Sequence, residues 1–229
     1  MPYEPHDLLR VDSAEVVEPA PDPRGPARSG MREALTRAPW VVVRRDRAPD
    51  GLVPVGVRGA GRADRWAAFV QAKAVREQVS PQQLADRPAA RRANRVPALD
   101  ALARVARVLE GRQLVWGPGG GGGFELATGL EVLSEDSDVD LVLCAPEPLP
   151  VPYVARLLRD LSDAAAPVRA DVQLLTPLGG VSAAEYAGGG DVLLRTDRGP
   201  RIVRSPWRAS ISQARSPGCD ESTAGGHRR

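Results

Sequence analysis

The chain has 229 residues and a formal net charge of +2, with 42% hydrophobic and 26% charged residues. This composition is typical of a globular protein with enough core to fold unaided, and an aromatic content of 4% argues against a surface of base-stacking rings. Its two cysteines, Cys144 and Cys219, are too few for a disulfide framework, and no apolar run approaches membrane-spanning length. We therefore expect a reduced, cytoplasmic protein.

The N-terminal region begins with a short apolar run at 8–11 and a loose, proline-rich segment at 18–30. Two runs rich in valine follow, at 39–45 and 52–59. The turn-forming Pro-Asp-Gly between them predicts a β-hairpin.

Residues 62–78 repeat apolar side chains at helical spacing, with Trp66 and Phe69 on one face, so we expect a helix there. The stretch 80–97 is broken by proline and rich in arginine, and we interpret it as a linker with a short helical turn. These elements predict a small α+β N-terminal domain over residues 1–92.

The second region, over residues 93–207, alternates helical and strand patterns, which predicts an α+β domain with a mixed sheet and flanking helices. The polar, aperiodic segment 208–229 is predicted to be a disordered tail. The expected elements are a helix at 98–109, a strand at 113–116, a helix or turn at 124–130, a strand at 137–144, a helix at 151–164, a strand at 169–175 and a hairpin at 191–203.

Two aspartates, Asp138 and Asp140, alternate with apolar residues in the strand at 137–144. Side chains two apart on a strand point the same way, about 7 Å apart. Facing carboxylates repel each other unless a cation lies between them, and Mg²⁺ is a hard ion that prefers such oxygens. If the strand carrying Asp171 pairs beside this one, three carboxylates converge into one metal-binding and catalytic group.

Five consecutive glycines precede these aspartates. A glycine-rich turn after a strand can point backbone N–H groups at a phosphate, so Gly120 and Gly121 are candidate phosphate-binding residues. The spacing fits neither a P-loop nor a dinucleotide-binding fingerprint, and the run could equally be a flexible loop. Ser137 is a weaker candidate, which could instead cap the strand edge.

Arginine supplies almost all the positive charge, because Lys73 is the only lysine. Arg58, Arg62 and Arg65 cluster where the predicted helix begins, and could hold phosphates or an acidic partner. The alternative is a solvated face in an arginine-rich chain. The same two interpretations apply to the arginines of the last hairpin, Arg195, Arg198 and Arg201.

Seven motifs together resemble the malonate decarboxylase holo-acyl-carrier-protein synthases, also called phosphoribosyl-dephospho-CoA transferases. This family belongs to the nucleotidyltransferase superfamily, so the resemblance implies a nucleotidyltransferase-like catalytic domain. The motifs occur in the family's order, as PHDLL (5–9), PWVVVRR (39–45), VPVGVRGAGRADRWAAFV (53–70), GFELATG (123–129), SDVDLVL (137–143), DVQLLTPLGGVSAAEYA (171–187) and LLRTDRGPRIVRSPW (193–207).

The resemblance implies a donor, 2′-(5″-triphosphoribosyl)-3′-dephospho-CoA, and an acceptor, a serine on the acyl-carrier subunit of malonate decarboxylase. Transfer would release pyrophosphate. Asp138 and Asp140 would hold Mg²⁺, and Asp171 would bind the metal or accept the serine proton. The family usually has Gly-Ser in its loop, whereas this chain has Gly120 and Gly121.

Two other functions stay open on the residues alone. One is a nucleotidyltransferase acting on a small-molecule acceptor, which would keep the aspartates but need no carrier protein. The other is a non-catalytic basic binding module, for which few aromatics and a modest net charge are weak support.

Overall fold

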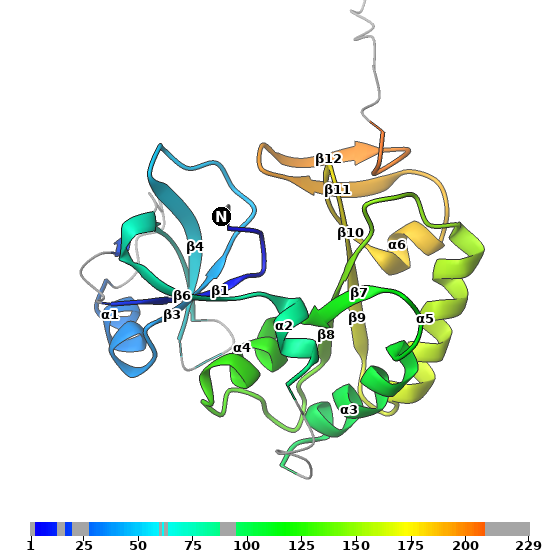
Figure 1. Cartoon of the computed structure of the whole chain (residues 1–229), viewed down its shortest axis with the longest axis horizontal. Coiled ribbons are helices and arrows are strands. Elements are labelled where there is room, and N and C mark those ends of the chain that lie inside the picture. Colours follow the sequence, from blue (N-terminus) through cyan, green and yellow to red (C-terminus); the bar gives the residue numbers. More distant parts are fainter. Residues whose placement is uncertain are drawn as a thin grey trace, which may run out of the picture.

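The computed structural model shows two units side by side, each built on a six-stranded sheet (Figure 1). None of the helices among the described residues is long and apolar enough to span a bilayer. The structure describes residues 3–12, 17–19, 28–59, 61, 64–87 and 95–208.

The first unit is an antiparallel sheet in the order β2-β5-β4-β3-β1-β6, with helix α1 (Arg28–Arg37) packed on it. Its core is mainly valine, and Met31 and Leu35 of α1 close it. The predicted hairpin is confirmed as β3 and β4, whereas α1 begins inside the segment expected to be loose. The strands are β1 (Leu8–Val11), β2 (Val17–Pro19), β3 (Trp40–Val43), β4 (Leu52–Arg58), β5 (Arg65–Gln71) and β6 (Val75–Val79).

The helix predicted at 62–78 is wrong. The segment instead forms β5, a short 3₁₀ turn (Ala72–Ala74) and β6. All seven residues of β5 pair with β4. Side chains therefore alternate between the two faces of the sheet, with Ala68 and Val70 buried and Ala67 exposed. The apolar residues of this segment fit both the helical and the strand period, and pairing with β4 makes the segment a strand.

The second unit has the strand order β12-β11-β10-β9-β8-β7, in which only β8 and β9 are parallel. One face is covered by α3 (Pro97–Leu109), α5 (Val151–Ala165) and α6 (Ala183–Ala187), which share a core of Leu and Val side chains with the sheet. The strands are β7 (Val115–Pro118), β8 (Val139–Cys144), β9 (Ala170–Thr176), β10 (Gly179–Ser182), β11 (Val192–Thr196) and β12 (Gly199–Val203).

The long amphipathic helices, the strand carrying Asp171 and the terminal hairpin are confirmed as α3, α5, β9 and β11–β12. The sequence did not predict β2, β10 or α6, which are three to five residues long and carry no periodic signal. The short helical turn is α2 (Pro81–Ala85), started by a capping box between Ser80 and Gln83. The rest of the predicted linker, 88–94, and the tail beyond 208 lie outside the described residues.

The glycine run is not a loop. Helix α4 (Gly120–Thr128) begins within it, with Gly119 as the N-cap. The helix-favouring residues Phe124 to Ala127 follow the glycines, and Gly129 ends the helix with a positive φ of 82°. Gly120, Gly121 and Gly122 therefore have backbone N–H groups without partners in the helix, and the first helical bond is that of the Gly123 N–H to the oxygen of Gly119 at 2.7 Å.

A third core joins the two units. Trp40 and Val79 of the first sheet pack with Leu84 of α2 and Phe124 of α4. Gly117 allows α2 to approach β7, because a Cβ on Gly117 would overlap the carbonyl oxygen of Pro81. This packing places the N-terminal sheet opposite the free face of the second sheet.

We predict that Gly117→Ala lowers the free energy of unfolding by about 1–3 kcal/mol, the usual cost of overpacking, because the α2 backbone must move. Urea unfolding measures the change. The matched control is Gly122→Ala, whose Cβ would meet only Leu102 at 3.9 Å in a helix where alanine is favoured. Equal stability of the two variants would contradict the proposed close packing.

Candidate active site

A pocket of about 610 Å³ lies between the two units. The first unit contributes His6, Arg58 and Arg65 to its lining, and the second unit contributes Gly120, Asp140 and Asp171 among others. Neither unit could form this pocket alone, because each supplies one wall.

The three predicted aspartates line this one pocket. Asp140 on β8 and Asp171 on β9 are register partners in the parallel pair. Asp138 lies just before β8, which begins at Val139 rather than at residue 137 as expected. The expected pairing of the two strands is therefore confirmed, while the metal-binding and catalytic roles of the three aspartates stay predictions.

An arginine that the sequence analysis passed over bridges two of the aspartates. Arg169 donates from Nη2 to Oδ2 of Asp138 at 2.8 Å, and the same nitrogen lies 3.9 Å from Oδ2 of Asp171. Its side chain is 67% exposed, so this ion pair is screened by water and open to exchange. The carboxylates of Asp138 and Asp171 thus already attract one positively charged side chain.

The surroundings of Asp140 raise the pKa of its carboxyl group. Burial raises its pKa, and the charges of Asp171 and Asp138 raise it further. Arg65 and the backbone N–H of Gly121 lower the pKa, but the net direction is upward. The pocket therefore disfavours the ionised form of Asp140, because its positive groups do not offset burial and the two neighbouring carboxylates.

Within the described residues, no three His, Cys, Asp or Glu side chains are arranged closely enough to hold a metal ion by themselves. Asp138, Asp140 and Asp171 are the carboxylates of the pocket that could contribute oxygens to one. Mg²⁺ commonly takes only one or two carboxylates and completes its shell with water and phosphate oxygens, so the residues present fit that ion together with a phosphate ligand.

Helix α4 meets these carboxylates at its N-terminus. The N–H of Gly119 donates to the backbone oxygen of Asp140 at 2.9 Å. Gly120 has a φ of 50°, and a Cβ there would overlap Oδ2 of Asp140. The next N–H, of Gly121, hydrogen-bonds the Asp140 carboxylate. The helix thus presents its positive end to the pocket, as an anion site requires.

Position 121 differs from position 120. A Cβ on Gly121 would lie 2.8 Å from Cδ2 of Leu133 and 3.4 Å from Nη2 of Arg58. Both neighbours are ends of flexible side chains, so a serine is possible here at the cost of a small shift of Leu133. Position 120 therefore requires glycine, whereas position 121 can accommodate a small side chain such as serine.

The first unit brings two of the predicted arginines to the pocket. Arg58 and Arg65 are register partners at the end of the β4–β5 hairpin. The Arg58 guanidinium lies 6.0 Å from the centroid of the Phe124 ring, which places it beside the first turn of α4. Arg62 lies outside the described residues.

Ser137 lines the pocket but has a local partner. Its Oγ accepts a hydrogen bond from the N–H of Ser134 at 2.9 Å, and the side chain is buried. Ser137 thus caps the turn that precedes β8, whereas the sequence offered a cap of the strand edge as the alternative; its role as a phosphate ligand stays a prediction.

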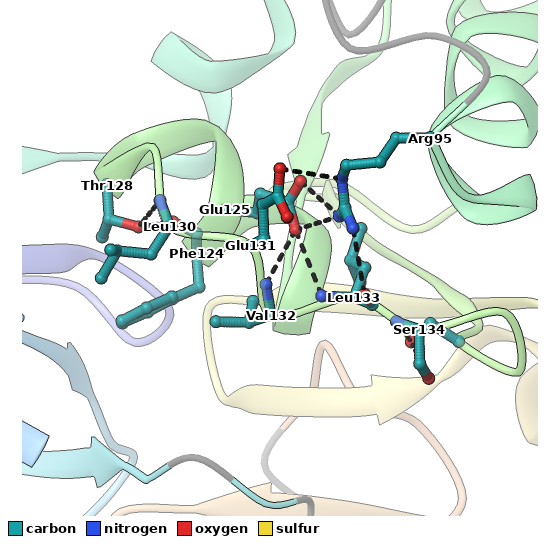
Figure 2. A network of polar contacts seen from close by, with 10 residues as sticks. Arg95, Phe124, Glu125, Thr128, Leu130, Glu131, Val132, Leu133 and Ser134 are labelled. Carbon is teal, nitrogen blue, oxygen red and sulfur yellow. Dashed lines mark hydrogen bonds and ion pairs between the residues drawn. The ribbon is translucent and has the colours of Figure 1, made fainter.

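A buried ion pair, which sequence reasoning missed, supports the segment leading to the aspartates (Figure 2). Glu125 of α4 is fully buried and accepts from Nη2 of Arg95 at 2.6 Å on both oxygens. Its Oε2 also accepts the N–H groups of Val132 and Leu133, at 3.0 and 3.1 Å. Burial raises the pKa of Glu125, but these hydrogen bonds and the Arg95 charge outweigh it, so the net pKa is lowered.

The far end of the pocket is lined by four residues, of which the sequence analysis singled out only Arg195. His6, Gln173, Ser182 and Arg195 line it. His6 has a φ of 79° and hydrogen-bonds the side chain of Gln173, which ties the N-terminal segment to β9. Burial, and secondly the charge of Arg45, lowers the pKa of His6, so its imidazole is neutral at pH 7.

We predict that Gly120→Ala abolishes activity, because the methyl group displaces the Asp140 carboxylate and φ becomes strained. Gly121→Ser should retain activity, since only Leu133 must shift. Steady-state rates of the purified variants provide the comparison. Equal loss in both would show that Asp140 does not depend on its contact with Gly120.

We predict that Glu125→Gln lowers the free energy of unfolding by about 2–3 kcal/mol at pH 7, the usual worth of hydrogen bonds to a charged group. Because the folded-state pKa of Glu125 lies below its ordinary value of 4.5, this stabilisation is present above pH 4.5 and is lost as the pH falls through the folded value. Urea unfolding at pH 7 and at about pH 3 should therefore show the gap between wild type and variant closing. A constant gap would contradict the ionised pair.

Both parts of the chain match models of known protein families. Residues 4–81 match the phosphoribosyl-dephospho-CoA transferase MdcG N-terminal domain, and residues 83–206 match the MdcG C-terminal domain. No solved structure gives a significant match.

Curated relatives agree over nearly the full length. A phosphoribosyl-dephospho-CoA transferase of Pseudomonas putida (strain GB-1) is 44% identical over 90% of this chain and 95% of its own. Proteins of the same name from Pseudomonas syringae pv. tomato and Klebsiella pneumoniae are 45% and 37% identical, over 89% of this chain and over 92% and 95% of theirs. The chain is therefore an enzyme that belongs to the phosphoribosyl-dephospho-CoA transferase family.

Proposed function

We propose that this enzyme moves the 2′-(5″-phosphoribosyl)-3′-dephospho-CoA group from its triphosphoribosyl donor to a serine of the apo acyl-carrier subunit of malonate decarboxylase, releasing pyrophosphate. The observation that carries this proposal is the pocket in which Asp138, Asp140 and Asp171 face the N-terminus of α4 and two arginines of the other unit. The names of the relatives support the donor class.

The reaction is a displacement at the α-phosphorus of the donor. The serine oxygen forms a bond to that phosphorus, and the bond to the bridging oxygen of the pyrophosphate breaks. The attacking and leaving oxygens lie roughly in line in such transfers. Asp171, whose side chain is 52% exposed, is the best placed of the three carboxylates to take the serine proton.

The leaving phosphates would be held at the α4 end of the pocket. Arg58 lies beside the first helical turn, and Arg65 is close enough to Asp140 to lower its pKa. Positive charge and backbone N–H groups at a helix N-terminus together favour a polyanion.

We further propose Mg²⁺ as the cofactor, held by Asp138 and Asp140 with water and donor phosphate oxygens, while Asp171 takes the serine proton. When bound with the donor, Mg²⁺ neutralises charge that develops on the phosphate oxygens. The raised pKa of Asp140 and the draw of Arg169 toward Asp138 and Asp171 both support a cation at this place.

The cytoplasm remains the proposed location, on the low cysteine content of the sequence. Of the other functions, the non-catalytic binding module is excluded by the family. A small-molecule acceptor is the less favoured enzyme reaction, because the whole N-terminal unit matches the family and helps to line the pocket.

The direct test mixes the protein, the triphosphoribosyl donor, Mg²⁺ and the apo carrier, and measures the carrier mass. We expect a gain of one phosphoribosyl-dephospho-CoA group, one pyrophosphate released per carrier, and no reaction when EDTA replaces Mg²⁺. Pyrophosphate release without a mass gain on the carrier would overturn the proposed acceptor.

We predict that Asp140→Asn lowers the transfer rate at least about a hundredfold while raising the denaturant midpoint. The pKa of Asp140 is raised by folding, so its ionised form opposes folding at pH 7 and an amide relieves that cost. Asp163→Asn, on the exposed side of α5, is the control for loss of one carboxylate and should leave both values unchanged. A destabilised, inactive Asp140→Asn protein would contradict this account.

A further inference from the structure

The β11–β12 hairpin carries a concentration of positive charge that the proposed reaction has not used. The segment 191–208 holds five arginines against two aspartates, although the whole chain has a net charge of only +2. All five arginines are exposed. Asp197 is already paired with Arg47 at 3.5 Å, and within the described residues none of the five has an ion-pair partner.

The two faces of this hairpin differ. Leu193 pairs with Ile202 and Arg195 pairs with Pro200, so these four side chains share one face. Leu194, paired with Arg201, is buried on the other face, toward the helices. Ile202 is 68% exposed, the largest fraction among the exposed large hydrophobic residues that the structure describes.

The face that carries Ile202 is continuous with the pocket. Arg195 lines the pocket together with Gln173 and Ser182, which are register partners on β9 and β10. The sheet order therefore leads from Asp140 and Asp171 across β10 to the hairpin, whereas α4 packs at the β7–β8 side. Figure 1 shows the hairpin and α4 at opposite ends of the second unit.

In-line displacement assigns these two ends to different reactants. If the pyrophosphate leaves toward the first turn of α4 and Arg58, the attacking oxygen must arrive from the opposite side of the phosphorus. That side is the end lined by Gln173, Ser182 and Arg195, next to the hairpin. A macromolecular acceptor that reaches in from there must rest on the hairpin.

We propose that the acceptor protein docks on the face of the β11–β12 hairpin that is continuous with the pocket. This face is formed by Arg195, Pro200 and Ile202, with Arg198 at the turn of the hairpin. The inference rests on the proposed function and names the surface that the acceptor uses. The matching partner surface is an acidic segment with an apolar side chain, close to the serine that is modified. Exposed isoleucine and proline beside arginines favour a protein over a nucleic acid, which would offer only phosphates to this face.

The test compares Arg198→Glu and Ile202→Glu with Arg201→Glu as the matched control. Arg201 is the neighbour of Ile202 on the same strand, undergoes the same charge change as Arg198, and belongs to the opposite face. The first two variants should raise the KM for the carrier by roughly five- to thirtyfold, the range typical of interface anchors. The control should change it by less than about twofold, as expected outside an interface.

Measurements of kcat and of donor binding distinguish weaker docking of the carrier from damage to the pocket. In all three variants, the kcat at saturating carrier and the Kd for the donor should stay within about twofold of wild type, because the hairpin residues changed do not line the pocket. Unchanged thermal midpoints establish that the variants fold; if Ile202→Glu does not, Ile202→Ala takes its place.

Several results would overturn the docking surface. One is an unchanged carrier KM in Arg198→Glu and Ile202→Glu, and another is an equal rise in Arg201→Glu. A third is loss of binding to a short DNA duplex, rather than to the carrier, in the hairpin variants. If the wild type binds the apo carrier without modifying it, the proposed reaction fails, and weaker carrier binding by the two variants still supports the surface. A wild type that does not bind the carrier at all overturns it.

Discussion

The carboxylate of Asp140 lies against the backbone of Gly120, and the rest of the pocket is arranged around this contact. Gly120 can accept it because it has no side chain and a φ of 50°. The N–H of Gly119 holds the backbone oxygen of the same aspartate at 2.9 Å, so the start of α4 is fixed on β8. Since β8 and β9 are paired at Asp140 and Asp171, the helix N-terminus and the carboxylates are positioned as one group.

This group depends on packing well away from it. The core of Trp40, Leu84 and Phe124 holds the first unit against α4, and thereby sets where Arg58 and Arg65 reach. The Glu125–Arg95 pair anchors the backbone of the segment that carries Leu133 and leads to Asp138. The positive and negative parts of the pocket thus come from different units, and interface packing determines the distance between them.

The features that the sequence predicted well are those that a short periodic pattern determines. The helix α5 and the strands β8 and β9 each have one clear period, and the alternation of Asp138 and Asp140 with valine and leucine indicated the site. The segment 62–78 was mispredicted because its apolar residues fit two periods, and only pairing with β4 distinguishes them. Glycine has low helix propensity, so the start of α4 at Gly120 has no local signal.

Partners far apart in the sequence were also beyond prediction. Glu125 and Arg95 are 30 residues apart, and Arg169 and Asp138 are 31 apart. A local pattern reports which face a side chain occupies, but not which distant charge it meets. The motif GFELATG contained Glu125, yet a buried glutamate in a helix pattern indicates an unknown partner and does not name it.

The charges of the pocket suggest how its ligands depend on each other in the proposed reaction. Three arginines, Arg58, Arg65 and Arg195, and the three aspartates line it, so the formal charges of these groups cancel. A triphosphate entering alone would meet Arg58 and Arg65, but it would also meet the carboxylates. A divalent cation at the aspartates removes that repulsion and leaves the arginines in excess, while the phosphates in turn complete the shell of the cation. Because binding free energies are reciprocal, the donor must strengthen metal binding by the same factor as the metal strengthens donor binding.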